Sequence, residues 1–186
     1  MATSDQILQA CKALQSHGVI AYPTESVFGL GCDPDNAESV KRILALKNRP
    51  AEKGLILIAS SFVQLEKYLL PVPADVQQRV FASWPGPFTW LWPVRDEVSE
   101  LIRGQHATIA VRVSAHPVVK QLCESFGKAI ISTSANPAEK APAKNATEVR
   151  NYFDDRLDYI LDADVGSSSQ PTEIRDALSN ELVRAG

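Results

Sequence analysis

Residues 40–59, VKRILALKNRPAEKGLILIA, place an amphipathic helix shortly before a buried strand. Val40, Ile43 and Leu44 recur at the i, i+3 and i+4 positions of one apolar helix face. Pro50 disfavours any continuation of that helix. The wholly apolar run LILIA that follows is typical of a strand inside a sheet. This order of elements predicts an α/β protein.

Three cationic residues, Lys47, Arg49 and Lys53, fall between the predicted helix and the predicted strand. Lys47 takes the next position, i+7, on the apolar stripe. Two interpretations remain open from this stretch alone. The cations bind an anionic ligand, or they are solvated residues that the helix dipole favours near its C-terminus by about 0.3–1 kcal/mol each.

The overall composition excludes several classes of protein. A hydrophobic content of 45% is ample for a core, and a net charge of −3 argues against a general binder of nucleic acid or membrane surfaces. Cys11, Cys32 and Cys123 are far apart and form no metal-ligand spacing with the histidines, so we expect buried thiols in a reducing cytoplasm and no metal site. No signal peptide or membrane span is evident, and residues 1–186 are expected to form one domain.

The remaining periodicities predict helices that alternate with strands. Capping boxes at Thr3 and Ser61 each predict a helix start, and Gly18 predicts a helix end. Residues 23–35 are predicted to form a loop. Further helices are expected after Asn36, at 75–84, at 116–127 and from 145 to 152, and strands at 19–22, 89–94, 108–114, 129–131, 159–164, 172–177 and 181–186.

Short polar side chains follow two of the predicted strands. Thr24 and Ser26 come just after the strand at 19–22, where ligands of open α/β sheets tend to lie. The run ISTSAN supplies four more polar side chains, those of Ser132, Thr133, Ser134 and Asn136. Such groups donate hydrogen bonds to an anionic ligand, and they are equally typical of a structural turn.

Arg112 lies within the otherwise apolar strand predicted at 108–114. Its neighbours alternate, with Ile109, Val111 and Val113 on the other face. A buried charge requires a partner, which is either an internal carboxylate or an anionic ligand. The aromatic residues from 84 to 92 are expected to belong to the core and not to a base-stacking platform.

Several segments in this order resemble the YrdC-like family of threonylcarbamoyl-AMP synthases, in its short form without an additional C-terminal domain. The resemblance covers nearly the whole chain. It is carried by YPTESVFGLG (22–31), KNRP (47–50) with Lys53 and LILIA, WPGPFT (84–89), TIAVRV (108–113), ISTSAN (131–136) and the tail PTEIRDALSNELVRAG (171–186).

The resemblance implies a cytoplasmic enzyme that joins L-threonine, bicarbonate and ATP into threonylcarbamoyl-adenylate and pyrophosphate, with Mg²⁺ accompanying the ATP. Separate transfer proteins would then pass the threonylcarbamoyl group to adenosine 37 of tRNA, and a weak contact with tRNA is compatible with this role. The implied fold is a single α/β domain with a twisted, mixed sheet, parallel and antiparallel, flanked by helices around a large, positively charged cavity.

The family's Lys-x-Arg and Ser-x-Asn pairs match Lys47, Arg49, Ser134 and Asn136, which the resemblance implies to be catalytic. It implies contacts with the substrates or ATP for a further set of residues, namely Thr24, Ser26, Lys53, Arg112, Ser132, Thr133, Thr172 and Arg184. Phe28 stands where the family usually has Tyr, and Gly54 stands where Pro is common.

The cations would offset the repulsion between a triphosphate, a carboxylate and a carbamate. No general base is evident, so catalysis is expected to rest on positioning and charge stabilisation. Two rival hypotheses are an RNA-binding module that assists tRNA or ribosome maturation and a nucleotide-binding regulator without catalysis. The net acidity, and the lack of a long basic stripe with interleaved aromatics, argue against the RNA-binding module.

Overall fold

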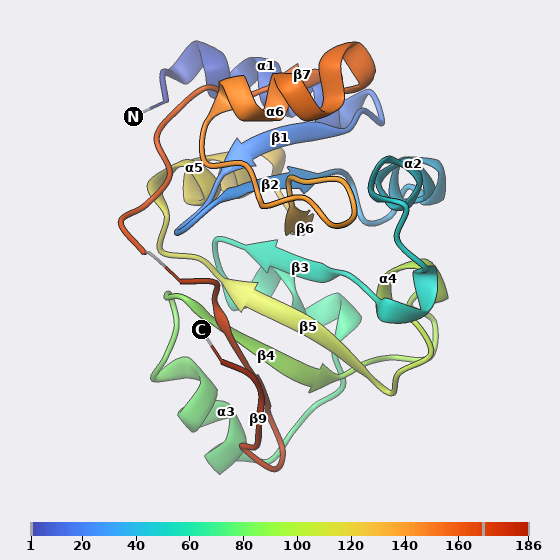
Figure 1. Ribbon diagram of the computed structural model, residues 1–186. Helices are drawn as coiled ribbons and strands as arrows, with labels where there is room; N and C mark the ends of the chain where they lie inside the picture. Colours follow the sequence, from blue (N-terminus) through green and yellow to red (C-terminus); the bar gives the residue numbers. More distant parts are fainter. Residues whose placement is uncertain (1, 169, 186) are drawn as a thin grey trace.

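The computed structural model describes residues 2–168 and 170–185, and a mixed sheet of nine strands forms its centre (Figure 1). The spatial order is β7-β1-β2-β6-β3-β5-β4-β8-β9. Three neighbouring pairs are parallel, namely β1 with β7, β3 with β5 and β4 with β8, and the other pairs are antiparallel. The expectation of a single-domain α/β fold with a mixed sheet is confirmed.

The strands are β1 (Ile20–Pro23), β2 (Phe28–Gly31), β3 (Ile56–Ala59), β4 (Phe88–Pro93), β5 (Thr108–Val113), β6 (Ile130–Ser134), β7 (Tyr159–Ile160), β8 (Glu173–Asp176) and β9 (Leu182–Arg184). The helices are α1 (Ser4–Gln15), α2 (Ala37–Lys47), α3 (Ala74–Phe81), α4 (Glu100–Arg103), α5 (Pro117–Phe126) and α6 (Ala146–Phe153). Among the described residues, no helix is long and apolar enough to cross a membrane.

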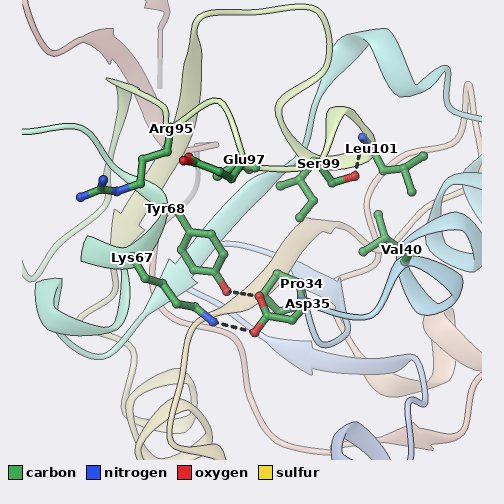
Figure 2. A pocket seen from close by; sticks show the side chains of 12 residues that line it. Pro34, Asp35, Val40, Lys67, Tyr68, Arg95, Glu97, Ser99 and Leu101 are labelled. Atoms are coloured by element: carbon green, nitrogen blue, oxygen red, sulfur yellow. Dashed lines mark hydrogen bonds and ion pairs between the residues drawn. The ribbon is translucent and has the colours of Figure 1, made fainter.

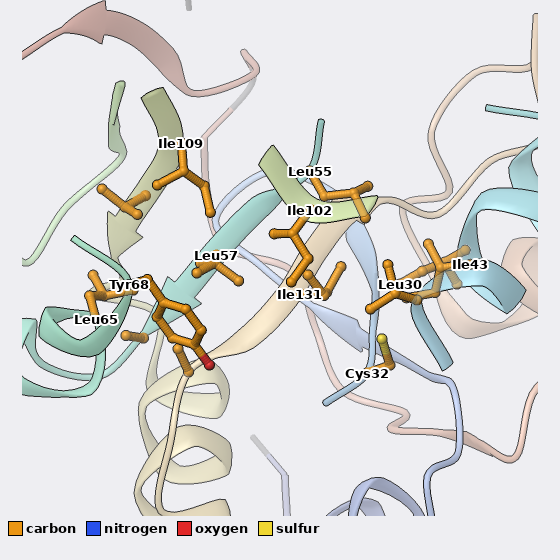
Figure 3. Packing of buried hydrophobic residues seen from close by; sticks show 14 of the residues in the cluster. Leu30, Cys32, Ile43, Leu55, Leu57, Leu65, Tyr68, Ile102, Ile109 and Ile131 are labelled. Atoms are coloured by element: carbon orange, nitrogen blue, oxygen red, sulfur yellow. The ribbon is translucent and has the colours of Figure 1, made fainter. Parts of the chain in front are cut away.

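The sheet separates two apolar clusters, because neighbouring residues of a strand point to opposite faces. The larger cluster contains Leu57 and Ile131 of the sheet together with Ile43 of α2 and Ile102 of α4 (Figure 3). Trp90 and Trp92 are buried in this cluster, as expected. The three cysteines are free and buried, which confirms the expectation of buried thiols.

The smaller cluster lies on the other face, where α1 and α5 pack against Ile20, Ile58 and Ile130. These helices cover only part of that face. Further along the same face, at alternate positions of β6, β3 and β5, lie Ser132, Ser134, Ile56, Ala110 and Arg112. The uncovered part of the sheet therefore carries short polar side chains and one cation.

Most predicted elements are confirmed, including α1 with the complete capping box of Thr3 and Gln6, and α6 with its Asn145 cap. The predicted loop at 23–35 was wrong in part, because β2 forms within it. The sequence of β2, FGLG, contains two glycines, and these interrupt the β-branched and aromatic pattern by which a strand is predicted. Gly31 is nevertheless required in β2, since a Cβ there would lie 2.6 Å from Cε1 of Tyr22.

The helix predicted after Ser61 was also wrong. Two short 3-10 helices, Phe62–Gln64 and Glu66–Tyr68, take its place. Gln64 does not complete a capping box, because its Oε1 accepts hydrogen bonds from both the main-chain N–H and the hydroxyl of Ser60, at 3.0 and 3.1 Å.

Several predicted helices and strands were longer than the elements observed. The helix predicted at 75–84 ends at Phe81, and the strand predicted at 159–164 covers only Tyr159–Ile160. His17, and not Gly18, takes the left-handed conformation after α1, with φ of 61°. Residue 186, part of the last predicted strand, lies outside the described residues.

Gly31→Ala is expected to lower the free energy of unfolding by about 2–4 kcal/mol, because the new methyl would meet the Tyr22 ring and the carbonyl oxygen of Ile131 at 2.8 Å. Urea denaturation measures the loss. Gly127→Ala is the matched control, since no atom of the described residues lies within 4 Å of a Cβ there and only its φ of 83° is unfavourable, at about 1 kcal/mol. Equal losses in both variants would contradict the steric explanation.

Candidate functional site

A cavity of about 410 Å³ opens over the uncovered part of the sheet. Its lining includes four cationic side chains, those of Arg49, Arg112, Lys144 and Arg184. No aspartate or glutamate occurs among the residues that line it in the described part of the chain. A lining with this charge is suited to an anionic ligand.

Several elements far apart in the sequence supply the polar groups of this cavity. The end of β6 supplies Ser132 and Ser134, β5 supplies Arg112, and the β1–β2 turn supplies Thr24 and Ser26. Gly29 of β2 leaves the space next to Ser132 open, since a Cβ there would lie 3.4 Å from the hydroxyl of Ser132. Apart from Arg112, these positions carry small side chains, which leave space above the sheet.

Most of the predicted site residues line this cavity, namely Thr24, Ser26, Arg49, Arg112, Ser132, Thr133, Ser134, Thr172 and Arg184. Lys53 lines a neighbouring cavity of about 300 Å³, which shares Arg49 and Arg184 with the first. Lys47 and Asn136 belong to neither lining among the described residues. The structure therefore joins most of the predicted set and places two members beside it.

The ammonium group of Lys47 is directed at main-chain oxygens at the end of β6. It donates to the carbonyls of Ser134 and Asn136 at 2.5 and 2.8 Å and to Oδ1 of Asn136 at 3.2 Å. An ammonium has three N–H donors, so all of them are used. Asn136 in turn donates to the carbonyls of Pro137 and Lys140. Lys47 thus ties the end of α2 to the turn that follows β6.

Burial, with a smaller contribution from the nearby charge of Arg49, lowers the pKa of Lys47 to about 8. The side chain is only 7% exposed, so the charged form loses most of its hydration. The three oxygens are what makes a buried ammonium tolerable at neutral pH.

Arg49 is also held by the main chain. Its Nε and Nη2 both donate to the carbonyl of Gly54, at 3.1 and 2.9 Å. Burial lowers its pKa from the ordinary value. These contacts leave the Nη1 group of Arg49 without a protein acceptor among the described residues, next to the cavity that it lines.

Of the two partners that the sequence leaves open for Arg112, the structure shows the internal carboxylate. Its guanidinium Nη2 lies 3.6 Å from Oε2 of Glu25, and the same side chain lines the cavity. Burial, and then repulsion by Arg112, lower the pKa of Arg184, whose Nη2 donates to the carbonyl of Thr172 at 2.8 Å. An anion bound between these two guanidinium groups would relieve that repulsion.

Sequence reasoning missed Glu25, Lys144 and Gln170. Lys144 and Gln170 line the cavity from loops whose composition carries no pattern. Glu25 had a usable signal. It lies between Thr24 and Ser26, which were both singled out, and an internal carboxylate was one of the two partners open to a buried Arg112.

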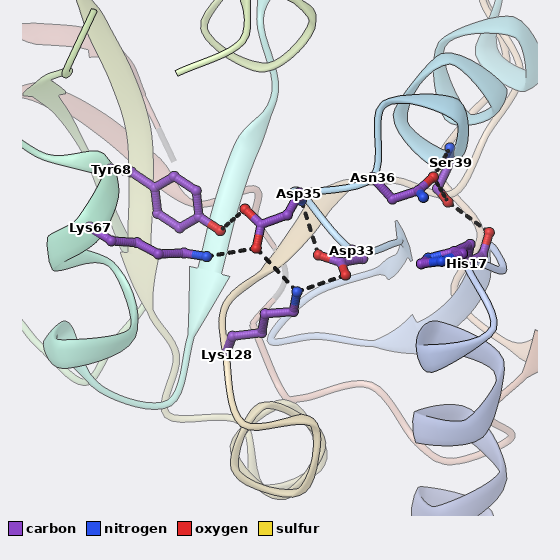
Figure 4. Close-up of polar contacts among 8 residues, drawn as sticks. All are labelled: His17, Asp33, Asp35, Asn36, Ser39, Lys67, Tyr68 and Lys128. Atoms are coloured by element: carbon purple, nitrogen blue, oxygen red, sulfur yellow. Dashed lines mark hydrogen bonds and ion pairs between the residues drawn. The ribbon is translucent and has the colours of Figure 1, made fainter. Parts of the chain in front are cut away.

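A second cavity, of about 350 Å³, lies on the other side of the sheet (Figure 2). Acidic and basic side chains both line it, among them Asp35, Lys67, Arg95 and Glu97. Asp35 accepts from Lys67 at 2.6 Å and from the Tyr68 hydroxyl at 2.9 Å, and Lys128 bridges Asp33 and Asp35 (Figure 4). Because these charges compensate one another, this cavity is a weaker candidate for an anion site.

No group of three or more histidine, cysteine, aspartate or glutamate side chains that could hold a metal ion occurs among the residues described.

Comparison with known proteins gives a consistent match over the whole chain. The Sua5/YciO/YrdC family model, described as "Telomere recombination", matches residues 12–186. The threonylcarbamoyl-AMP synthase of Photobacterium profundum is 52% identical over 184 residues, which cover 98% of this chain and 100% of that protein. The protein of the same name from Halorhodospira halophila is 48% identical over 179 residues, 96% of this chain and 94% of that protein.

Solved structures show the same fold. P. abyssi Sua5 complexed with L-threonine matches with a TM-score of 0.88 and 31% identity, over 96% of this chain and 53% of that one. E. coli YciO matches with a TM-score of 0.86 and 25% identity, over 99% of this chain and 90% of that one. The present chain thus spans about half the length of the Sua5 chain.

The titration of Lys47 is expected to have its midpoint at about pH 8. The ¹³Cε shift in protein labelled at lysine measures it, and Lys47→Met identifies the signal. The unfolded chain holds this proton more tightly than the folded protein, so the contribution of Lys47 to stability increases as pH rises from about 8 toward 10.5. A midpoint near 10.5 would show that the three oxygen acceptors outweigh burial.

Proposed function

The chain belongs to the Sua5/YciO/YrdC family, and from this membership we propose that it is an enzyme that makes threonylcarbamoyl-AMP and pyrophosphate from L-threonine, bicarbonate and ATP. The carrying observation is the 52% identity to a protein named for that product, over 98% of this chain and 100% of that protein. The cationic lining of the cavity, which contains no aspartate or glutamate among the described residues, supports the same conclusion.

The reaction brings several negative charges into one space, and the cavity supplies the opposite charge. Arg49, Arg112 and Arg184 would offset the repulsion between phosphate, carboxylate and carbamate oxygens. The hydroxyls of Ser132 and Ser134 would add hydrogen bonds without adding charge. In a partly desolvated cavity each of these contacts contributes more than in water.

We assign different roles to the members of the predicted catalytic set. Arg49 and Ser134 line the cavity and would contact the reactants. Lys47 and Asn136 would act by fixing the turn after β6, so that Ser134 faces the cavity. Lys53 would contribute positive charge from the adjoining cavity.

In the proposed reaction, the protein acts mainly by positioning the carbamate against the α-phosphorus of ATP. Bicarbonate loses water to give carbon dioxide, which the threonine amine takes up with loss of a proton to form a carbamate. A carbamate oxygen then attacks the α-phosphorus, and pyrophosphate leaves. No protein group is needed as a covalent nucleophile, so holding the carbamate in line with the scissile bond would supply much of the rate. Mg²⁺ bound with ATP would neutralise part of the phosphate charge.

The surrounding pathway is part of the same proposal. Threonylcarbamoyl-AMP is a mixed anhydride, and a separate transfer protein would have to carry its acyl group to tRNA in the cytoplasm. The relatives are named for synthesis of the adenylate, which does not favour a role as an RNA-binding module. We therefore treat any contact with tRNA as secondary to the synthase reaction.

The proposed function is tested by pyrophosphate release, which is expected to require threonine, bicarbonate and ATP together. Arg49→Ala is expected to lower the rate by about 100-fold or more, because a cation facing the developing phosphate charge is lost. Lys67→Ala, in the charge-compensated cavity, is the control and is expected to change the rate by less than about twofold.

Circular dichroism of both variants checks that the fold is kept. Normal turnover by Arg49→Ala would contradict the assigned role of that residue. ATP consumption by the unaltered protein without threonine would contradict the reaction itself.

A further inference from the structure

Two buried polar atoms beside the cationic cavity have no hydrogen-bond partner among the described residues. They are Nε of Arg112 and Oε2 of Glu25. Buried polar groups are almost always paired in folded proteins, so such atoms require an explanation. The Nη2 group of Arg112 lies 3.6 Å from the same Oε2, which is beyond an ordinary hydrogen bond. The two charges therefore form an ion pair without a hydrogen bond between them.

The carboxylate of Glu25 is fixed by another residue. Ser114 donates its hydroxyl hydrogen to Oε1 at 2.5 Å and accepts a hydrogen bond from the main-chain N–H of His116 at 3.1 Å. The main-chain carbonyl of Glu25 accepts from the N–H of Ser168 at 3.1 Å. Glu25 is therefore held in place independently of Arg112.

In this geometry the carboxylate of Glu25 offsets the charge of Arg112 without accepting a hydrogen bond from its guanidinium N–H groups. Coulomb attraction falls only as the reciprocal of distance, whereas a hydrogen bond weakens steeply as its geometry departs from the ideal. Arg112 is 5% exposed, and a guanidinium so deeply buried would be costly without an opposite charge nearby. Among the described residues no acceptor takes a hydrogen bond from its side chain, in contrast to Arg49 with its two bonds to Gly54.

We propose that Glu25 is an internal counter-ion that determines which anions Arg112 accepts. A small inorganic anion that enters the cavity gains Arg112 but meets the negative charge of Glu25. A ligand that also bonds to the hydroxyls and to the other cations gains enough to bind. This inference rests on the proposed function, in which the oxyanion at Arg112 is the threonine carboxylate or a phosphate of ATP.

The test compares sulfate inhibition of pyrophosphate release in the unaltered protein and in Glu25→Gln. The amide keeps the size of the side chain and an oxygen for Ser114, and it removes the charge. The inhibition constant for sulfate is expected to fall by about tenfold or more, because Arg112 is left as an unpaired buried charge. The melting temperature without sulfate is expected to fall, and sulfate is expected to restore it more than chloride of equal ionic strength does.

Whether sulfate competes with threonine or with ATP identifies the substrate group that Arg112 receives. Glu25→Asp keeps the charge, and its inhibition constant is expected to lie closer to that of the unaltered protein. Glu100→Gln is the matched control, since Glu100 also lies 3.6 Å from an arginine but is 75% exposed. It is expected to leave the inhibition constant unchanged.

Ser114→Ala is a second test, in which the inhibition constant for sulfate is expected to change in the opposite direction. It applies even if Glu25→Gln fails to fold. It frees the carboxylate to move within hydrogen-bond distance of Arg112, so sulfate is expected to bind more weakly. An unchanged or raised sulfate constant in Glu25→Gln, or a lowered one in Ser114→Ala, would overturn the inference. An unaltered protein that releases no pyrophosphate would instead refute the proposed function, which keeps the two failures distinct.

Discussion

Mutual repulsion among cations at the uncovered part of the sheet is the constraint that the surrounding structure has to offset. Arg112 lowers the pKa of Arg184, and Arg49 lowers that of Lys47, in each case second to burial. The protein stabilises these groups largely with main-chain carbonyls, those of Ser134, Asn136, Gly54 and Thr172. A carbonyl dipole accepts a hydrogen bond without adding a formal charge, so the excess positive charge remains for a ligand.

The elements that the sequence predicted well are those whose signal is local. In α1 and α6 a cap and an apolar stripe agree, and in β5 alternation places Arg112 opposite Ile109 and Val111. The strand β2 was not predicted, because its two glycines are explained only by the close approach of other strands. Such an approach depends on the pairing of segments far apart in the chain, which no local pattern contains.

In the candidate site, too, the sequence predicted some features, whereas others depend on contacts between distant segments. Residue type and order were enough to single out Arg112, Ser132 and Ser134, which the fold brings to one cavity. They were not enough to tell a side chain that lines the cavity from one that supports its wall, as Lys47 does. The sequence also posed a choice between an internal partner and a ligand for Arg112. The distance of 3.6 Å to Glu25 allows both, and only coordinates supply it.

The contacts of Lys47 have a consequence for how this residue would be recognised in comparisons of many sequences. Two of its three acceptors are main-chain oxygens, which every amino acid at positions 134 and 136 provides. A substitution at position 134 therefore keeps its carbonyl contact with Lys47 and does not favour a compensating change of the lysine. Statistical methods that detect neighbours through correlated substitution would find little coupling between position 47 and position 134, although an ammonium and a carbonyl meet there.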